Sequence, residues 1–126
     1  MIALSNKVNQ RGIEDNRVSL TQGSVLELPY GDQSADLVTA LETIQFWPDI
    51  PQALAEIRRV LKPGGRLVII NRYPPEGSVW WNKIQLKSDE AYRSALEATG
   101  FAGIKINTEF RKHWIIAEAK RKNKKD

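Results

Sequence analysis

The sequence predicts an α/β fold in which parallel strands precede a C-terminal antiparallel hairpin. A short apolar run at residues 36–40 (Asp-Leu-Val-Thr-Ala) leads into an amphipathic helix at 49–61, and a second apolar run follows at 66–70 (Arg-Leu-Val-Ile-Ile). A strand, a helix and a strand in this order are typical of one parallel crossover unit. Two alternating runs between residues 103 and 120 are joined by a short polar link, which predicts the hairpin.

The segment before the first apolar run is expected to hold a helix, a strand and a loop. Spaced apolar residues predict a helix over residues 1–10, and Gly12 can end it. Alternation of apolar and polar residues predicts a strand over 17–22, whereas the proline, glycine, aspartate and serine residues between 23 and 35 predict a loop. The strand at 36–40 is apolar enough to be buried on both faces of a sheet.

The clearest helix signal spans residues 49–61. Asp49 can cap its first turn, and Gln52 stands three residues later, as in a capping box. Pro63 cannot continue a helix, and Gly64 or Gly65 can adopt a left-handed conformation at the helix end. The face expected to be buried is an apolar stripe made of Ile50, Leu54, Ile57 and Leu61.

A long connection is expected over residues 72–87, where paired prolines and paired tryptophans occur. Connections of this length within a domain are often functional segments. Ser88 can then cap a second helix. Strands are expected at 103–110 and 113–120, with the turn of the hairpin at 111–112.

The composition limits the class of protein. The chain has 126 residues, of which 41% are hydrophobic and 27% charged, as in one soluble globular domain. It has no cysteine and one histidine, His113, which excludes disulfides, thiolate metal sites and clustered imidazoles within one chain. No apolar run approaches the roughly 20 residues of a membrane span, and no signal peptide is evident. A cytoplasmic location without a membrane partner is therefore expected.

The net charge of +4 resides at the C-terminus. Residues 120–126 carry five basic groups and one acid, so residues 1–119 sum to zero. We expect residues 1–119 to form the folded domain and 120–126 to form a solvated basic tail. A nucleic-acid binder more often carries a basic stripe on folded structure, so no nucleic-acid partner is expected, although Trp80 and Trp81 could stack on bases.

The order of these motifs resembles a known family. Gly-Ser-Val at 23–25, Leu-Pro-Tyr at 28–30, Asp-Leu-Val at 36–38 and Leu-Lys-Pro-Gly-Gly at 61–65 follow the pattern of a class I S-adenosylmethionine-dependent methyltransferase. The similarity is greatest to the type 11 group, which includes quinone-biosynthesis methyltransferases. The resemblance implies a Rossmann-like methyltransferase fold, S-adenosylmethionine as cofactor and a small molecule as methyl acceptor.

The resemblance also implies which residues contact the cofactor. Ser24 stands where relatives have an acid that accepts a hydrogen bond from the adenine amino group, and it is a weaker acceptor because it is shorter and uncharged. The backbone N–H of Val25 would donate to the adenine ring. Ala40, Leu41 and Glu42, at the end of the next strand, would lie beside the methionine part of the cofactor.

The same resemblance assigns residues 43–47 to the substrate mouth. Phe46 and Trp47, together with Tyr73 in the long connection, favour an apolar or aromatic acceptor. The family implies no dedicated catalytic residue, because alignment of donor and acceptor supplies much of the rate enhancement in such enzymes. No metal site is implied either.

Two cofactor elements of the family have no counterpart in this sequence. These are the glycine-rich loop after the first strand and the acid that ends the second strand. Residues 1–4 (Met-Ile-Ala-Leu) resemble the helix that follows the second strand, so residues 1–119 are expected to be the C-terminal two-thirds of the domain, lacking its first two strands. The family sheet has the order 3-2-1-4-5-7-6, so the strand at 36–40, the fourth, is expected to become an edge.

Three polar features are expected to have ordinary structural roles. Glu42 is either a base near the acceptor or, more simply, an exposed acid at a helix entry. His113 is expected to begin an edge strand. Glu56 and Arg59 are three residues apart on one helix and are expected to form a weak surface ion pair.

Two functions fit these observations. The first is methyl transfer, with this chain alone expected to be inactive because half of the cofactor site is missing. The second is a non-catalytic half-domain that associates with itself through its open sheet edge. The exposed apolar edge favours a homodimer or a domain-swapped dimer.

Overall fold

The computed structural model describes residues 23–74, 76–78, 81, 85–109 and 111–123. The helix and the strand that the sequence predicts within residues 1–22 lie outside this described part. In chain order, the elements are β1 (Ala35–Leu41), the 3₁₀ turn η1 (Ile44–Phe46), α3 (Ile50–Val60), β2 (Leu61–Arg72), α4 (Asp89–Ala98), β3 (Phe101–Asn107) and β4 (Trp114–Arg121).

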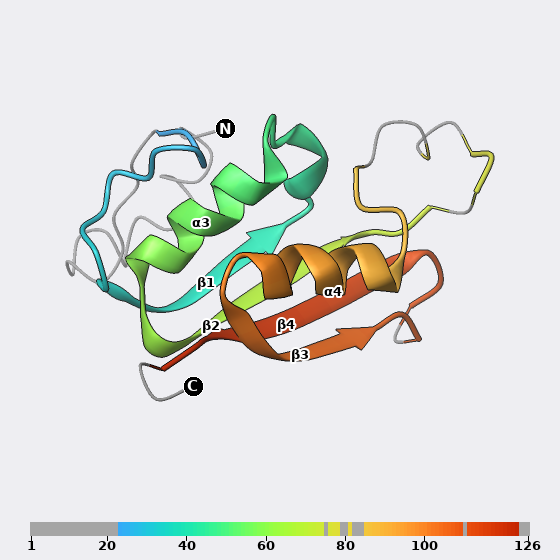
Figure 1. Cartoon of the computed structure of the whole chain (residues 1–126). Helices are drawn as coiled ribbons and strands as arrows, with labels where there is room; N and C mark the ends of the chain where they lie inside the picture. Colours follow the sequence, from blue (N-terminus) through green and yellow to red (C-terminus); the bar gives the residue numbers. More distant parts are fainter. Residues whose placement is uncertain (1–22, 75, 79–80, 82–84, 110, 124–126) are drawn as a thin grey trace, which may run out of the picture.

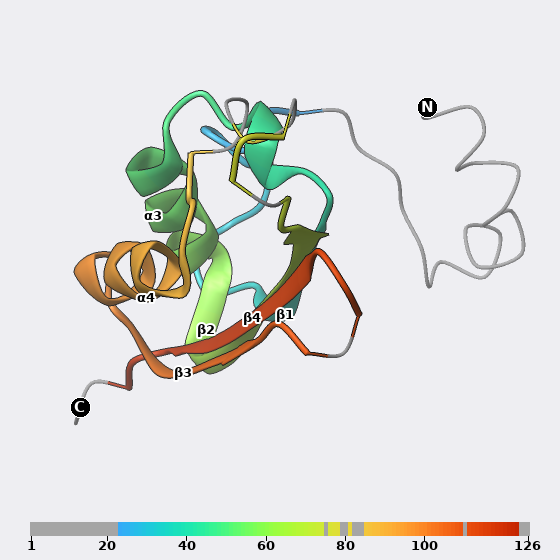
Figure 2. The ribbon, with the colours of Figure 1, turned by 90° about the vertical axis from the view of Figure 1, so that its right-hand side faces the viewer.

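The described strands form one mixed sheet in the order β1-β2-β4-β3. β1 and β2 are parallel, whereas β4 runs antiparallel to both of its neighbours, β2 and β3. Helices α3 and α4 lie on the same face of the sheet (Figures 1 and 2). This is the order expected for strands four, five, seven and six of the family sheet, so the predicted parallel unit and C-terminal hairpin are confirmed.

The hydrophobic core lies between the two helices and the sheet. α3 contributes Leu54 and Ile57, α4 contributes Leu96, and the facing sheet residues include Leu67 and Ile115, all of them buried. Burial of such aliphatic side chains contributes about 1.5–3 kcal/mol each. The core therefore holds the two helices against one face of the sheet.

β1 is an edge strand that is buried on one face only. Among the described strands it pairs only with β2, which agrees with the edge position expected from the sequence. Ala40 is buried toward the helices, but the side chains of Leu37 and Leu41 are 54% and 63% exposed. Burial on both faces was therefore a wrong prediction, because no described element covers the face away from the helices.

The sequence signals at the ends of α3 are mostly confirmed. The Asp49 side chain accepts a hydrogen bond from the Gln52 N–H (3.0 Å), which caps the first turn. The helix ends directly at Val60, and residues 61–65 already belong to β2. Gly65 is required at this junction because a Cβ there would lie 2.8 Å from the Lys62 carbonyl oxygen.

The hairpin differs from the prediction in its turn. β3 ends at Asn107 and β4 begins at Trp114, so the connection is longer than residues 111–112. His113 lies in that connection with a φ of 63°, and its carbonyl accepts a hydrogen bond from the Tyr73 N–H (2.7 Å). The prediction that His113 begins an edge strand is wrong on both counts, since β4 lies between β2 and β3.

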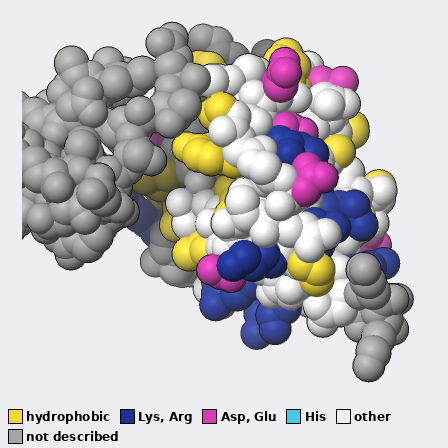
Figure 3. Space-filling view, turned by 90° about the vertical axis from the view of Figure 1, so that its left-hand side faces the viewer, with side chains coloured by type: hydrophobic (Ala, Val, Ile, Leu, Met, Phe, Trp, Pro, Cys, Tyr) yellow, Lys and Arg dark blue, Asp and Glu magenta, His cyan; other side chains and the backbone are white. Residues whose placement is uncertain are grey.

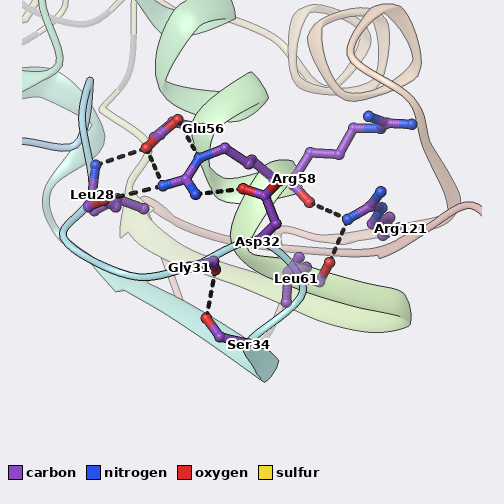
Figure 4. Close-up of polar contacts among 9 residues, drawn as sticks. Leu28, Gly31, Asp32, Ser34, Glu56, Arg58, Leu61 and Arg121 are labelled. Carbon is purple, nitrogen blue, oxygen red and sulfur yellow. Dashed lines mark hydrogen bonds and ion pairs between the residues drawn. The ribbon is translucent and has the colours of Figure 1, made fainter.

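β4 extends to Arg121 and thus includes the first two residues that the sequence assigns to the basic tail. The Arg121 guanidinium donates to the carbonyl groups of Arg58 (2.9 Å) and Leu61 (2.6 Å), at the C-terminal end of α3 (Figure 4). A positive charge there stabilises unpaired helix carbonyls. Arg121 is therefore part of the folded structure.

Candidate cofactor site

The residues expected to contact the adenine of the cofactor, Ser24 and Val25, lie in a tight turn before β1. The Glu27 N–H donates to the Ser24 carbonyl (3.1 Å), and the Leu26 N–H donates to Ser24 Oγ (3.1 Å). The side chain of Val25 packs against the core, whereas no described group accepts a hydrogen bond from its N–H. The Val25 N–H is therefore a candidate donor for a ligand.

A charged pair on α3 holds the residue that follows this turn (Figure 4). Glu56 Oε1 accepts a hydrogen bond from the Leu28 N–H (2.8 Å), and Arg59 Nη2 donates to the Leu28 carbonyl (3.1 Å). The two side chains also bind each other, with 3.0 Å from Arg59 Nε to Glu56 Oε2 and 2.6 Å from Nη2 to Oε1. We call this arrangement the Leu28 clamp.

The Leu28 clamp is not the weak surface pair that the sequence predicts. The Glu56 side chain is only 11% exposed and that of Arg59 is 33% exposed. The sequence does not predict this contact, because Leu28 lies 28 residues before Glu56 along the chain. A helical wheel gives a signal, since position 56 falls on the buried face with Ala53, Ile57 and Val60.

Further contacts tie the segment between Leu28 and β1 to the end of α3. Arg59 Nη1 donates to Asp32 Oδ1 (2.7 Å). The N–H groups of Gln33 and Ser34 donate to the carbonyls of Arg59 (2.9 Å) and Val60 (2.8 Å). Residues 28–34 therefore have a defined path from the turn to the first strand.

The charges of the Leu28 clamp stabilise each other. The hydrogen bond from Arg59 lowers the pKa of Glu56, against an opposing effect of burial, and the Leu28 N–H lowers it further. The hydrogen bonds from Arg59 to Glu56 and Asp32 raise the pKa of the guanidinium. Both groups are therefore ionised at neutral pH.

The second set of expected cofactor residues lies at the carboxyl end of β1. Ala40 is buried, and Leu41 is exposed. Glu42 has a φ of 51°, and its N–H donates to the Ile70 carbonyl (2.8 Å), while its carboxylate accepts from Arg72 Nε (2.8 Å). Ligands of parallel α/β sheets bind outside the carboxyl ends of the strands, which is where this set lies.

The three aromatic residues expected at the substrate mouth have different environments. Phe46 is 76% exposed, whereas Trp47 is 6% exposed and belongs to the core. Tyr73 is half-buried, and its hydroxyl donates to Asp89 Oδ1 (3.0 Å), at the start of α4. Burial, and secondarily this carboxylate, raises the pKa of Tyr73. Phe46 is thus the one of these three that presents its ring to solvent.

In Figure 1 the turn containing Ser24 lies to the left of α3, whereas η1 and the end of β1 lie toward the other end of that helix, and they overlap only in the projection of Figure 2. An open hollow of about 400 Å³ between α4 and β3 is lined by none of them.

The charged surface near the loop that precedes β1 is mixed. On the face shown in Figure 3, acidic and basic side chains are interspersed over the described part. Ion pairs in this part of the molecule include Arg59–Asp32 (2.7 Å) and Lys62–Asp36 (3.3 Å). Within the described ranges, no group of three or more His, Cys, Asp or Glu residues could hold a metal ion, and no helix is long and apolar enough to cross a membrane.

Comparison with known proteins identifies the family. A family profile described as "Methyltransferase domain" matches residues 1–69. The chain therefore belongs to this methyltransferase domain family, for which S-adenosylmethionine is the expected cofactor. The demethylmenaquinone methyltransferase of Lactiplantibacillus plantarum is 46% identical over 70 residues, which are 56% of this chain and 29% of that enzyme.

Solved structures confirm the fold. The YcgJ protein of Bacillus subtilis has a TM-score of 0.74 at 17% identity, and the match covers 98% of this chain and 79% of that chain. The [4+2]-cyclase SpnF has a TM-score of 0.78, also at 17% identity, with 97% and 62% covered. The matched segments span between 23% and 40% of the first curated relatives. The chain thus corresponds to part of these proteins.

Proposed function

We propose that this chain carries the base-recognition side of an S-adenosylmethionine-dependent methyltransferase that acts on a small molecule. The observation that carries the proposal is the turn at residues 24–28, which is tied to α3 at Leu28 and in which no described group accepts a hydrogen bond from the Val25 N–H. Membership of the methyltransferase domain family gives this arrangement its chemistry.

The described residues fit one side of the cofactor. The Val25 N–H is suited to donate to a ring nitrogen of adenine. Ser24 Oγ already accepts the Leu26 N–H, so it is a secondary acceptor for the adenine amino group. Leu41 offers an exposed apolar side chain to the methionine part, whereas the Ala40 side chain is buried, so that only its backbone could contact the cofactor. Bound S-adenosylmethionine would supply an electrophilic methyl group on a sulfonium, and these residues would orient it.

The acceptor in this proposal is an apolar or aromatic small molecule. Phe46 presents a largely exposed ring beside the end of β1. The related enzyme of Lactiplantibacillus plantarum is named for a demethylmenaquinone substrate, which supports an acceptor of this kind. In this proposal Glu42 is not a free base, because its carboxylate is paired with Arg72.

We further propose that the chain by itself does not catalyse methyl transfer. Its sequence contains no two glycines separated by one residue, the spacing at which such loops let the backbone approach the cofactor. A separate set of residues would have to complete the site. Since one solved neighbour is a cyclase, the fold alone does not decide the reaction, and direct binding must be measured.

The test is a nuclear magnetic resonance titration of the ¹⁵N-labelled chain with adenosine and with S-adenosylmethionine. We expect adenosine to shift the amide signals of Ser24 and Val25 with a dissociation constant on the order of 1 mM. Methyl transfer to a panel of small quinols and phenols should remain undetectable. Micromolar binding of S-adenosylmethionine, or turnover, would contradict the proposed inactivity. Absence of any shift would contradict the base site.

A second candidate function is self-association through β1. It is favoured by the position of β1 at an edge and by the exposure of Leu37 and Leu41. A strand edge with unpaired backbone groups is a template for another strand. The candidate predicts a dimer by sedimentation equilibrium that the charged variant Leu37→Lys weakens, while Ala98→Lys on the exposed face of α4 does not. A monomer at the highest attainable concentration would exclude it.

A further inference from the structure

The Leu28 clamp has a feature that ordinary helix packing does not require. Glu56 lies on the face of α3 that otherwise carries apolar core residues, yet it is a charged residue with 11% of its side chain exposed. Burying a carboxylate is costly unless it is paired and hydrogen-bonded, and an apolar residue of similar size is often as stable there. Glu56 is therefore expected to have a role other than stabilising the core by packing.

What the Leu28 clamp provides is control of a backbone. The Glu56 carboxylate and the Arg59 guanidinium, from one turn of α3, bind the N–H and the carbonyl of the same residue, Leu28, at 2.8 and 3.1 Å. They act as a neighbouring β-strand would, by holding both polar groups of one residue. Arg59 is itself fixed by Asp32 at 2.7 Å, so the guanidinium is held in one orientation.

This control matters because of how the preceding turn is built. The Leu26 N–H uses Ser24 Oγ, so the donor left for a ligand is the Val25 N–H. A backbone donor has no side-chain torsions and can be aimed only by fixing the chain around it. The nearest fixed point after Val25 that is held from α3 is Leu28.

We propose that Glu56 and Arg59 are positioning residues for base recognition, which fix the Leu28 backbone and thereby aim the Val25 N–H at the adenine ring. This inference rests on the proposed function for the identity of the ligand. The geometry of the Leu28 clamp does not depend on it. The pair acts through the turn and does not itself touch the base.

The experiment compares Glu56→Gln and Arg59→Lys with matched controls in the full chain. Glu56→Gln removes the charge and keeps the shape of the side chain. Arg59→Lys keeps the charge and removes the bidentate hydrogen bonding of the guanidinium. The controls are Glu97→Gln on the exposed face of α4 and Arg66→Lys, which alters an exposed pair with Glu118. Far-ultraviolet circular dichroism shows whether each variant is folded.

Two readouts are taken on every variant: hydrogen exchange of the Leu28 amide and the affinity for adenosine, followed at the Val25 signal. We expect both clamp variants to speed exchange at Leu28 by about tenfold and to weaken adenosine binding by about tenfold, with neither control doing so. Preserving the charge in Arg59→Lys is therefore not expected to restore either the slow exchange at Leu28 or the adenosine affinity.

Three results separate the possibilities. Faster exchange at Leu28 with unchanged adenosine affinity would overturn the positioning role. Unchanged exchange and affinity in both clamp variants would overturn the Leu28 clamp as well. If adenosine shifts no signal in the unaltered chain, the proposed base site fails, while the exchange rate at Leu28 still decides whether the clamp fixes the turn.

Discussion

The segments on either side of β1 are held by different forces. Before the strand, residues 28–34 are tied to α3 by a charged pair and by backbone hydrogen bonds. After the strand, η1 is anchored by burial of Ile44 and Trp47, while Phe46 between them is exposed. The polar contacts of residues 28–34, which we call the polar anchor, fix the direction of the backbone before β1. The buried side chains of Ile44 and Trp47, which we call the apolar anchor, fix the position of η1 and leave the Phe46 ring exposed. This division is consistent with the roles proposed above, adenine recognition before β1 and acceptor binding after it.

The largest expected effect is on the apolar anchor. Trp47→Ala should lower the free energy of unfolding by about 3–5 kcal/mol, because it removes a large buried side chain and leaves a cavity. Phe46→Ala, one residue away but exposed, should change it by less than about 0.5 kcal/mol. Urea unfolding followed by circular dichroism measures both. Equal losses in the two variants would mean that η1 is not anchored in this way.

The next effect is the pH dependence of the polar anchor. The pKa of Glu56 in the folded chain lies below the ordinary value of 4.5, so its ionised form is favoured by folding. Its contribution to stability is present above that ordinary value and is lost as the pH falls through the lower, folded-state pKa. The free energy of unfolding should therefore fall more steeply with acidification in the original chain than in Glu56→Gln.

Thermal unfolding of the two chains across this acidic range provides the measurement. Arg59 and Asp32 face Glu56 directly or through the guanidinium, so Asp32→Asn serves as a comparison that keeps Glu56 paired. If the slopes for the original chain and Glu56→Gln are the same, the carboxylate is not held as described.

The smallest effect is expected at the end of β1. In the pair between Glu42 and Arg72 the side chains are 35% and 60% exposed, and such partly exposed pairs typically contribute up to about 1 kcal/mol. Glu42→Gln should change the free energy of unfolding by less than about 0.5 kcal/mol and leave adenosine binding unchanged. A loss of binding in this variant would show that the base-side residues extend to Glu42.

The fold could be predicted largely from local signals. The caps at Asp49 and Ser88 and the apolar runs of β1 and β2 act over a few residues and give the elements their order. The burial of β1 could not be predicted in the same way, because it depends on which layer covers the outer face. The connection between β3 and β4 also contains a contact that no local signal predicts, the hydrogen bond from the Tyr73 N–H to the His113 carbonyl, because these residues are distant in sequence.

The candidate site was less accessible to sequence reasoning. A pair of opposite charges three residues apart on a helix is most often a surface pair, and the partner of Glu56 and Arg59 is a backbone that has no sequence signature. Adjacent aromatic residues look equivalent in a sequence, so the sequence assigns Trp47 and Phe46 to the same place. In the structure, the 3₁₀ turn directs one into the core and the other to solvent.

The measurement that tests the central claim most directly is the adenosine titration of the original chain, read at the Val25 amide. Weak, saturable binding that moves the signals of residues 24–28 and leaves those of α4 in place is the predicted result. Binding that instead moves the signals around Arg93 and Lys122, at the hollow between α4 and β3, would contradict the account.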